Sequence, residues 1–219
     1  MRNTRVAFLP KGEEGPLEPQ SYRVLLMLPS VYRLWAKTRL RHLTPWVEDW
    51  RTEEMYAGVP GRGAADASYH TALVIENCTL KGEELTGGAA DIYKRFDQID
   101  RTLLYRLLEE AGMPKGVMNA YRNFLENLEV YNTVAGGLGQ PYTKPASIPQ
   151  GDPLSMMVVA LLLRAWIIQM NRVGVEPRVL ADDLLLMATG DRSLPLFEYA
   201  YNLTHKHLDD MGAKVAPKK

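Results

Sequence analysis

The sequence has very little cysteine, since Cys78 is the only one among 219 residues. A single thiol cannot close a disulfide within the chain, which excludes a disulfide-stapled scaffold and makes a reducing compartment the expected setting. Residues 1–15 also lack the apolar segment and the small-residue cleavage site of a secretory signal. We therefore expect an intracellular protein of the cytoplasm or the nucleus that is not secreted.

Long apolar runs, internal repeats and low-complexity tracts are lacking as well. The longest apolar stretch, residues 154–163, ends at Arg164 after ten residues, about half of the ~20 that a membrane-spanning helix needs. Hydrophobic residues make up 46% of the chain and charged residues 24%. This composition is typical of an ordinary globular protein with a sizeable core and no membrane partner.

A basic excess, which nucleic-acid-binding proteins usually carry, is missing, because 26 Lys and Arg balance 26 Asp and Glu. The balance hides an uneven distribution. Residues 1–47 hold eight basic and three acidic side chains (+5), residues 48–111 seven and thirteen (−6), and residues 112–219 eleven and ten (+1). The sequence thus combines a basic N-terminal part with an acidic middle, an asymmetry that the total conceals.

The spacing of apolar residues and the positions of glycine and proline predict alternating strands and helices. Their order indicates an α+β fold in which helices cover an antiparallel sheet. The expected strands are residues 6–9, 22–27, 86–92, 129–134, 142–148, 178–181 and 184–188. The expected helices are residues 31–43, 67–77, a segment capped by Asp97 and ended by Gly112, and residues 114–128, 154–170 and 194–211.

Adjacent carboxylates at Asp182 and Asp183 interrupt an apolar hairpin. They are compatible with a polar turn, although tight hairpins favour Asn-Gly or Asp-Gly and neighbouring charges repel. Two carboxylates at the end of a partly buried hairpin also suit a divalent cation, and hard oxygen ligands favour magnesium. Both interpretations remain open at this point.

Asp91 ends a predicted strand within an apolar run, and it lacks the capping role that Asp97 has. If Asp91 and Asp182 lie on adjacent strands, they can share two magnesium ions about 3.5–4 Å apart, an arrangement that serves phosphoryl transfer. The spacing along the chain does not establish that adjacency.

Six segments resemble, in order, the fingers and palm of reverse transcriptases, most closely those of non-LTR (LINE-type) retrotransposons and more distantly those of group II introns. The segments are FLPKGEEGPLEPQSYRVLLMLPSVYRLWAKTRL, YAGVPGRGAADA, ADIYKRFD, SIPQGDPLS, LADDLLL and MGAKVAPKK. The resemblance implies a right-hand polymerase with fingers at residues 1–85 and a palm at residues 86–219, in which residues at about 113–148 are fingers-derived helices and a hairpin. It implies no thumb, and hence a truncated fragment of a retroelement protein.

The implied activity is that of an RNA-directed DNA polymerase, a nucleotidyltransferase that adds deoxynucleotides from dNTP to a primer 3′-hydroxyl. In this resemblance Asp91 and Asp182 are the principal ligands of two Mg²⁺ ions, for which Mn²⁺ can substitute, with the Ile92 carbonyl and Asp183 completing the site. Lys219 resembles the general acid that protonates the departing pyrophosphate.

The resemblance also assigns substrate contacts. Lys11 and Arg23 match residues that hold the triphosphate, for which basic side chains are chemically suited. Phe96 matches the aromatic residue that lies under the sugar and excludes a 2′-hydroxyl, while from the residues alone it is equally compatible with a core position. Gln150 and Gly151 match a loop beside the nucleotide and the template base.

Arg62 resembles a residue that contacts the template backbone, so the implied partners are an RNA template, a DNA or RNA primer and dNTP. A homo-oligomer formed through palm surface that a missing thumb leaves exposed is a further expectation. One departure from the family is Ala181, where an aromatic residue is common. Two other interpretations are a catalytically inactive palm that serves as a scaffold or binds a partner, and an RNA-dependent RNA polymerase.

Overall fold

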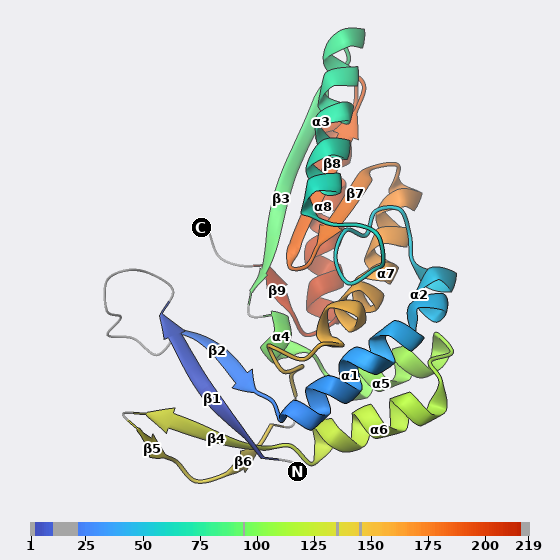
Figure 1. The fold of residues 1–219 in the computed structure, drawn as a ribbon. Coiled ribbons are helices and arrows are strands. Elements are labelled where there is room, and N and C mark those ends of the chain that lie inside the picture. Colours follow the sequence, from blue (N-terminus) through green and yellow to red (C-terminus); the bar gives the residue numbers. More distant parts are fainter. Residues whose placement is uncertain (1–2, 11–21, 94, 135, 145, 216–219) are drawn as a thin grey trace. The chain divides into compact units, whose positions relative to one another are not determined.

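The chain forms two compact units, each built from two separate stretches of sequence (Figure 1). The first unit combines Met1–Leu43 with Arg101–Ser155, and the second combines Thr44–Asp100 with Met156–Lys219. The predicted division at residues 85 and 86 follows the family resemblance and stays a prediction. The computed structural model describes residues 3–10, 22–93, 95–134, 136–144 and 146–215.

The first unit contains a sheet in the order β2-β1-β4-β5, with β6 also paired to β4. The strands β1 and β2 were both predicted, and they pair antiparallel. The parallel pairing of β1 with β4 has no counterpart in the sequence prediction. The strands are β1 (Asn3–Pro10), β2 (Tyr22–Met27), β4 (Glu129–Val134), β5 (Gly137–Leu138) and β6 (Tyr142–Thr143).

The predicted strand over residues 142–148 is wrong beyond Thr143, where β6 ends. Ser147 has a φ of 90°, which lies outside the range that strands adopt. Pro149 has no N–H to donate to a ladder. The segment that follows β6 is therefore a loop that leads to the long central helix.

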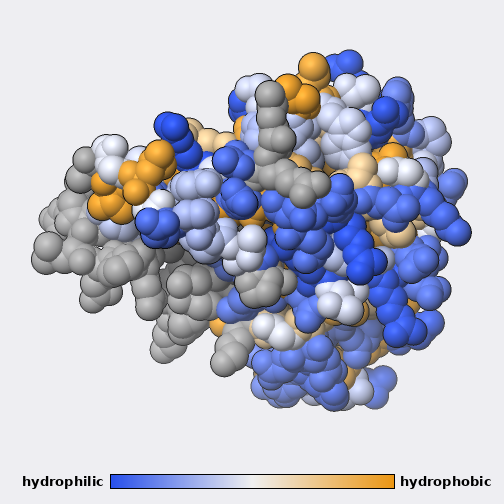
Figure 2. All heavy atoms as spheres, turned by 90° about the horizontal axis from the view of Figure 1, so that it is seen from below, coloured by the Kyte–Doolittle hydropathy of each residue, from blue (hydrophilic) through white to orange (hydrophobic). Residues whose placement is uncertain are grey.

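Three helices complete the first unit, namely α1 (Ser30–His42), α5 (Arg101–Glu110) and α6 (Lys115–Glu126). The α1 and α6 helices meet where the rings of Tyr32 and Phe124 stack, with centroids 3.5 Å apart. The predicted helices at residues 31–43 and 114–128 are confirmed within two residues at each end. Hydrophilic residues cover most of the described surface on the face in Figure 2.

The prediction that Asp97 caps the helix after it is wrong. Asp97 lies inside the short helix α4 (Arg95–Gln98), and α5 begins only at Arg101. One continuous helix was expected because Ile99, Leu103 and Leu104 recur at helical spacing. In the structure, residues 99 and 100 separate α4 from α5.

The second unit contains an antiparallel sheet in the order β7-β8-β3-β9. The helix α8 (Ser193–Asp210) packs against β8 and β3. Gly88 allows this approach, because a Cβ atom there would lie 2.8 Å from the Phe197 ring. The strands are β3 (Leu85–Tyr93), β7 (Glu176–Leu180), β8 (Asp183–Thr189) and β9 (Lys214–Val215).

The helix α7 (Ser155–Val173) provides the core of the second unit. Trp166 is fully buried, and its Nε1 donates a hydrogen bond to Thr204 Oγ1 of α8 at 3.0 Å. By length and composition alone α7 could cross a membrane, but a core helix passes the same test, and 56% of its most apolar window is buried. The predicted buried central helix is confirmed.

Two further helices belong to the second unit. The helix α2 (Thr44–Trp50) was not predicted, and α3 (Ala64–Lys81) extends beyond the predicted residues 67–77. Gly82, with a φ of 67°, ends α3 in the left-handed conformation that favours glycine. The buried Cys78 is a free thiol.

Candidate active site

Acidic residues of two neighbouring strands are paired in the second unit. Asp91 of β3 is paired in register with Asp183 of β8. The backbone N–H of Ile92 donates a hydrogen bond to the carbonyl oxygen of Asp182 at 3.2 Å. Asp91 and Asp182 are half-buried, whereas Asp183 is exposed. The strand pairing thus places Asp91 opposite Asp183, while Asp182 lies in the turn that precedes β8.

A tight turn fixes the position of Asp182. The strands β7 and β8 are paired up to Leu180 and Asp183, so only two residues connect them. Ala181 has a φ of 58°, in the left-handed region that costs about 1 kcal/mol or more for a residue with a Cβ atom. The strand pairing on both sides of the turn therefore offsets the conformational cost at Ala181.

The oxygen donors in this arrangement suit a hard cation. In the part of the chain that the structure describes, no group of three or more His, Cys, Asp and Glu side chains could hold a metal ion by itself. Magnesium is usually bound by only one or two carboxylates together with substrate phosphates. Asp91 and Asp183 are the two carboxylate residues that the strand pairing sets opposite each other.

The last described strand lies beside Asp91. The strand β9 pairs with the end of β3, so that Val215 is in register with Ile92. This places the start of the final predicted motif next to the acidic residues, although no strand was predicted there. Lys219, the predicted general acid, lies outside the described residues.

The predicted nucleotide contacts are distributed over both units. Arg23 is exposed on β2, and the loop with Gln150 and Gly151 belongs to the same unit. Lys11 lies outside the described residues. Phe96 lies in α4 of the second unit, and the description does not extend to its side chain.

The loop that contains Gln150 and Gly151 is bound to the end of β2. The carbonyl oxygen of Gln150 accepts a hydrogen bond from the Leu26 N–H at 3.2 Å. Gly151 has a φ of 105°, and a Cβ atom there would lie 3.3 Å from the Leu26 carbonyl oxygen. A glycine is therefore needed at this position for both its conformation and its close approach.

The Asp152 side chain caps the turn that leads into α7. Its Oδ1 accepts hydrogen bonds from the Leu154 N–H at 3.1 Å and from the Tyr32 hydroxyl at 3.0 Å. The residue is only 4% exposed, and burial raises the pKa of its carboxyl group to about 6, partly offset by these two bonds. Burial and the nearby Asp152 carboxyl also raise the pKa of Tyr121.

Because of Asp152, we expect the free energy of unfolding to decrease as the pH is raised from about 4 to about 6. Between pH 4 and pH 6 the folded protein retains a proton that the unfolded chain has lost, so raising the pH lowers the free energy of unfolding, by roughly 3 kcal/mol across the window. Asp152→Asn keeps an oxygen acceptor and cannot titrate. Urea unfolding gives the free energy of unfolding of both proteins at pH 4 and at pH 7. From pH 4 to pH 7 the variant should become about 3 kcal/mol more stable relative to the native protein. The same difference between variant and native protein at both pH values would contradict the role of Asp152.

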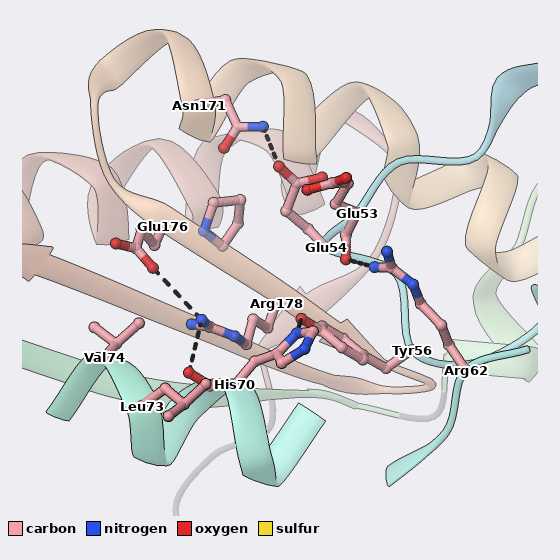
Figure 3. A pocket seen from close by; sticks show the side chains of 11 residues that line it. Glu53, Glu54, Tyr56, Arg62, His70, Leu73, Val74, Asn171, Glu176 and Arg178 are labelled. Atoms are coloured by element: carbon pink, nitrogen blue, oxygen red, sulfur yellow. Dashed lines mark hydrogen bonds and ion pairs between the residues drawn. The ribbon is translucent and has the colours of Figure 1, made fainter. Parts of the chain in front are cut away.

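Arg62 lines a cavity of about 350 Å³ in the second unit (Figure 3). Its guanidinium group donates a hydrogen bond to the Glu53 carbonyl oxygen and lies 5.7 Å from the centre of the Tyr56 ring. The residues described as lining this cavity include neither Asp91 nor Asp182. Arg62, the predicted template contact, thus binds residues of its own unit.

Three further polar residues of this cavity, Tyr56, His70 and Arg178, escaped the sequence analysis. Arg178 is only 8% exposed, and its NH2 donates a hydrogen bond to the His70 carbonyl oxygen at 3.3 Å. The Tyr56 hydroxyl and His70 Nδ1 lie 2.9 Å apart (Figure 3). A lone arginine within an apolar strand gives no signal of its burial in the sequence.

Solved structures share the fold of this chain. Telomerase from Candida albicans, in complex with a TWJ fragment of telomeric RNA, matches 98% of this chain and 42% of its own, with a TM-score of 0.74 and 15% identity. Apo telomerase from Candida tropicalis matches 98% of this chain and 42% of its own, with a TM-score of 0.72 and 10% identity. The predicted α+β fingers and palm fold is confirmed.

The sequence comparisons identify the family. Residues 9–219 match the model of the family "Reverse transcriptase (RNA-dependent DNA polymerase)", and the chain belongs to this family. Pol polyproteins of R2 retrotransposable elements are similar to it, with 26% identity over 86% of the chain for those of Bradysia coprophila and Drosophila melanogaster. The chain spans 22% and 18% of these relatives. The resemblance to LINE-type enzymes is confirmed.

Proposed function

We propose that this chain is the catalytic core of an RNA-directed DNA polymerase that transfers deoxynucleotides from dNTP to a primer 3′-hydroxyl. The observation that carries the proposal is the pairing of Asp91 with Asp183 on adjacent strands, with the Asp182 carbonyl bound to Ile92. Family membership supports it, because reverse transcriptases are nucleotidyltransferases.

Asp91, Asp182 and Asp183, together with the carbonyl oxygen of Ile92, would hold two magnesium ions, for which manganese could substitute. When bound, the ions lower the pKa of the primer hydroxyl and neutralise charge on the transferred phosphate. The partial burial of Asp91 and Asp182 strengthens their electrostatic interactions relative to bulk water. The strand pairing supplies the rigidity that such a site needs.

Further residues would bind the nucleotide. Lys11 and Arg23 hold the triphosphate, because charge-assisted hydrogen bonds to phosphate oxygens are the strongest that these side chains make. Phe96 lies under the sugar, and its bulk excludes a 2′-hydroxyl. Gln150 and Gly151 lie beside the nucleotide and the template base.

An RNA template and a DNA or RNA primer are the proposed macromolecular substrates. Arg62 would contact the template backbone, and Lys219 would protonate the departing pyrophosphate. The helix α1 supports binding of an anionic chain, because Arg33, Lys37 and Arg41 are exposed and recur every four residues along it. We expect this binding to be weak and to decrease steeply with salt.

The location and assembly of the protein are further proposals. Its substrates are found in the cytoplasm and the nucleus, where we place its activity. A homo-oligomer formed through palm surface is also proposed, and sedimentation at increasing protein concentration would detect it.

Primer extension on an RNA template tests the proposed function. With Mg²⁺ and dNTPs the protein should extend a DNA primer, and ribonucleotides should be incorporated about 100-fold less efficiently. Phe96→Val should narrow that preference. A preference for ribonucleotides would instead indicate an RNA-dependent RNA polymerase. Absence of both extension and magnesium-dependent nucleotide binding would indicate a scaffold.

A further inference from the structure

We propose that Arg101 is a positioning residue that holds the loop of residues 147–152 in the conformation in which Gln150 and Gly151 meet the nucleotide. The proposal rests on the proposed function for the role of that loop. None of the predicted catalytic or binding roles falls on Arg101. Its position, its hydrogen bonds and its burial point to this role.

Arg101 joins two segments of the first unit. Its Nε donates a hydrogen bond to the carbonyl oxygen of Ser147 at 2.9 Å, and its NH1 donates one to the carbonyl oxygen of Leu125 at 2.9 Å. Leu125 lies in the last turn of α6, and Ser147 begins the loop. Arg101 therefore fixes the start of the loop to the end of a helix.

The burial of Arg101 shows that these bonds matter. The residue is only 4% exposed, and its ion-pair partner Glu126 lies 3.8 Å from NH1 with a side chain that is 46% exposed. Removing a guanidinium group from water costs several kcal/mol unless hydrogen bonds compensate. Here backbone carbonyl oxygens supply much of that compensation, and the planar fork of arginine can reach two of them at once.

The loop needs such support because its backbone is strained. Ser147 has a φ of 90°, a conformation that costs a non-glycine residue about 1–3 kcal/mol. A free loop would relax away from it. The surrounding structure must therefore hold Ser147 in place, and the bond from Arg101 acts directly on its carbonyl oxygen.

Two other contacts hold the remainder of the loop. The Leu26 N–H binds the carbonyl oxygen of Gln150 at 3.2 Å, and the Tyr32 hydroxyl binds Asp152 at 3.0 Å. Arg101 acts at the opposite end from Asp152. Without it, the loop would keep its connection to β2 and α1 but lose the attachment that precedes Gln150.

Steady-state kinetics on an RNA template separates positioning from general stability. In Arg101→Met we expect the KM for dNTP to rise about 10-fold while kcat changes less than about 3-fold. Arg101→Lys should fall between this variant and the native protein, because lysine offers a point charge rather than a fork. Arg106→Met, an exposed position on the same helix, is the matched control and should keep the native KM.

Amide hydrogen exchange tests the same proposal without using activity. Under conditions in which circular dichroism shows Arg101→Met to be folded, residues 147–152 should exchange about 10-fold faster, with α8 unchanged. Native exchange in this loop, or uniformly faster exchange with an unchanged KM, would overturn the proposal. If the native protein extends no primer, the proposed function fails, and the exchange experiment still decides whether Arg101 holds the loop. Should Arg101→Met not fold, Arg101→Lys carries both measurements.

Discussion

Replacing Asp182 by asparagine is expected to lower the rate of RNA-templated primer extension roughly 1,000-fold, about 4 kcal/mol of transition-state stabilisation. Asparagine is nearly isosteric, so the β7–β8 turn and the bond between the Asp182 carbonyl and Ile92 should persist. The variant loses only the negative charge that would attract a divalent cation and help neutralise charge in the reaction. The expected defect is therefore in catalysis rather than in folding.

Single-turnover extension with saturating primer and template measures this effect. Asp191→Asn provides the matched control, because Asp191 is exposed in the same unit and carries no predicted role. The control should retain native activity, and both variants should unfold at the same urea concentration as the native protein. Raising the Mg²⁺ concentration should not fully restore the activity of Asp182→Asn. Native activity in Asp182→Asn would show that Asp182 is not part of the proposed metal site.

Replacing Gly58 by alanine is expected to destabilise the protein by roughly 3–5 kcal/mol. Gly58 has a φ of 75°, and an added Cβ atom would overlap the Met156 carbonyl group and lie 2.8 Å from the Met157 nitrogen. These are backbone atoms at the start of α7, so they cannot move aside as a flexible side chain would. The preceding segment is also fixed, because the Tyr56 N–H binds the Val179 carbonyl oxygen at 2.9 Å.

Gly61→Ala separates the clash from the strain at Gly58. Gly61 has a similar φ of 70°, but a Cβ atom there would meet nothing within 4 Å. Its replacement should cost only about 1 kcal/mol, from the left-handed backbone alone. Urea unfolding at one pH compares the two variants. Equal losses would show that close packing against α7 contributes nothing at Gly58.

Much of the second unit could be predicted from sequence because its patterns are local. Short apolar segments on either side of Asp182 and Asp183 predicted the β7–β8 hairpin, and a longer apolar run predicted α7 as the core helix. The acidic residues were recognisable because charge within an apolar strand is unusual. Their chemistry required only residue type and the assumption of adjacency.

In the first unit, local sequence patterns did not predict how the strands pair. The parallel pairing of β1 with β4 joins Asn3 to Glu129, two residues separated by most of the unit's sequence. Hydrophobic period predicts which residues face a core but not which strands pair across such a distance. Likewise, the prediction that Asp97 is a cap failed because local capping signals compete with tertiary packing of the flanking residues.

The sequence by itself determined most of the strands and helices, the acidic residues and the family, because each depends on residue types at short spacing or on ordered motifs. Only the tertiary structure decided that Asp91 meets Asp183 in register, that Ala181 adopts a left-handed turn, and that Arg101 binds Ser147. Register, strain and buried hydrogen bonds arise when distant segments satisfy each other's polar groups and volumes. No local pattern encodes which distant partner each segment will find.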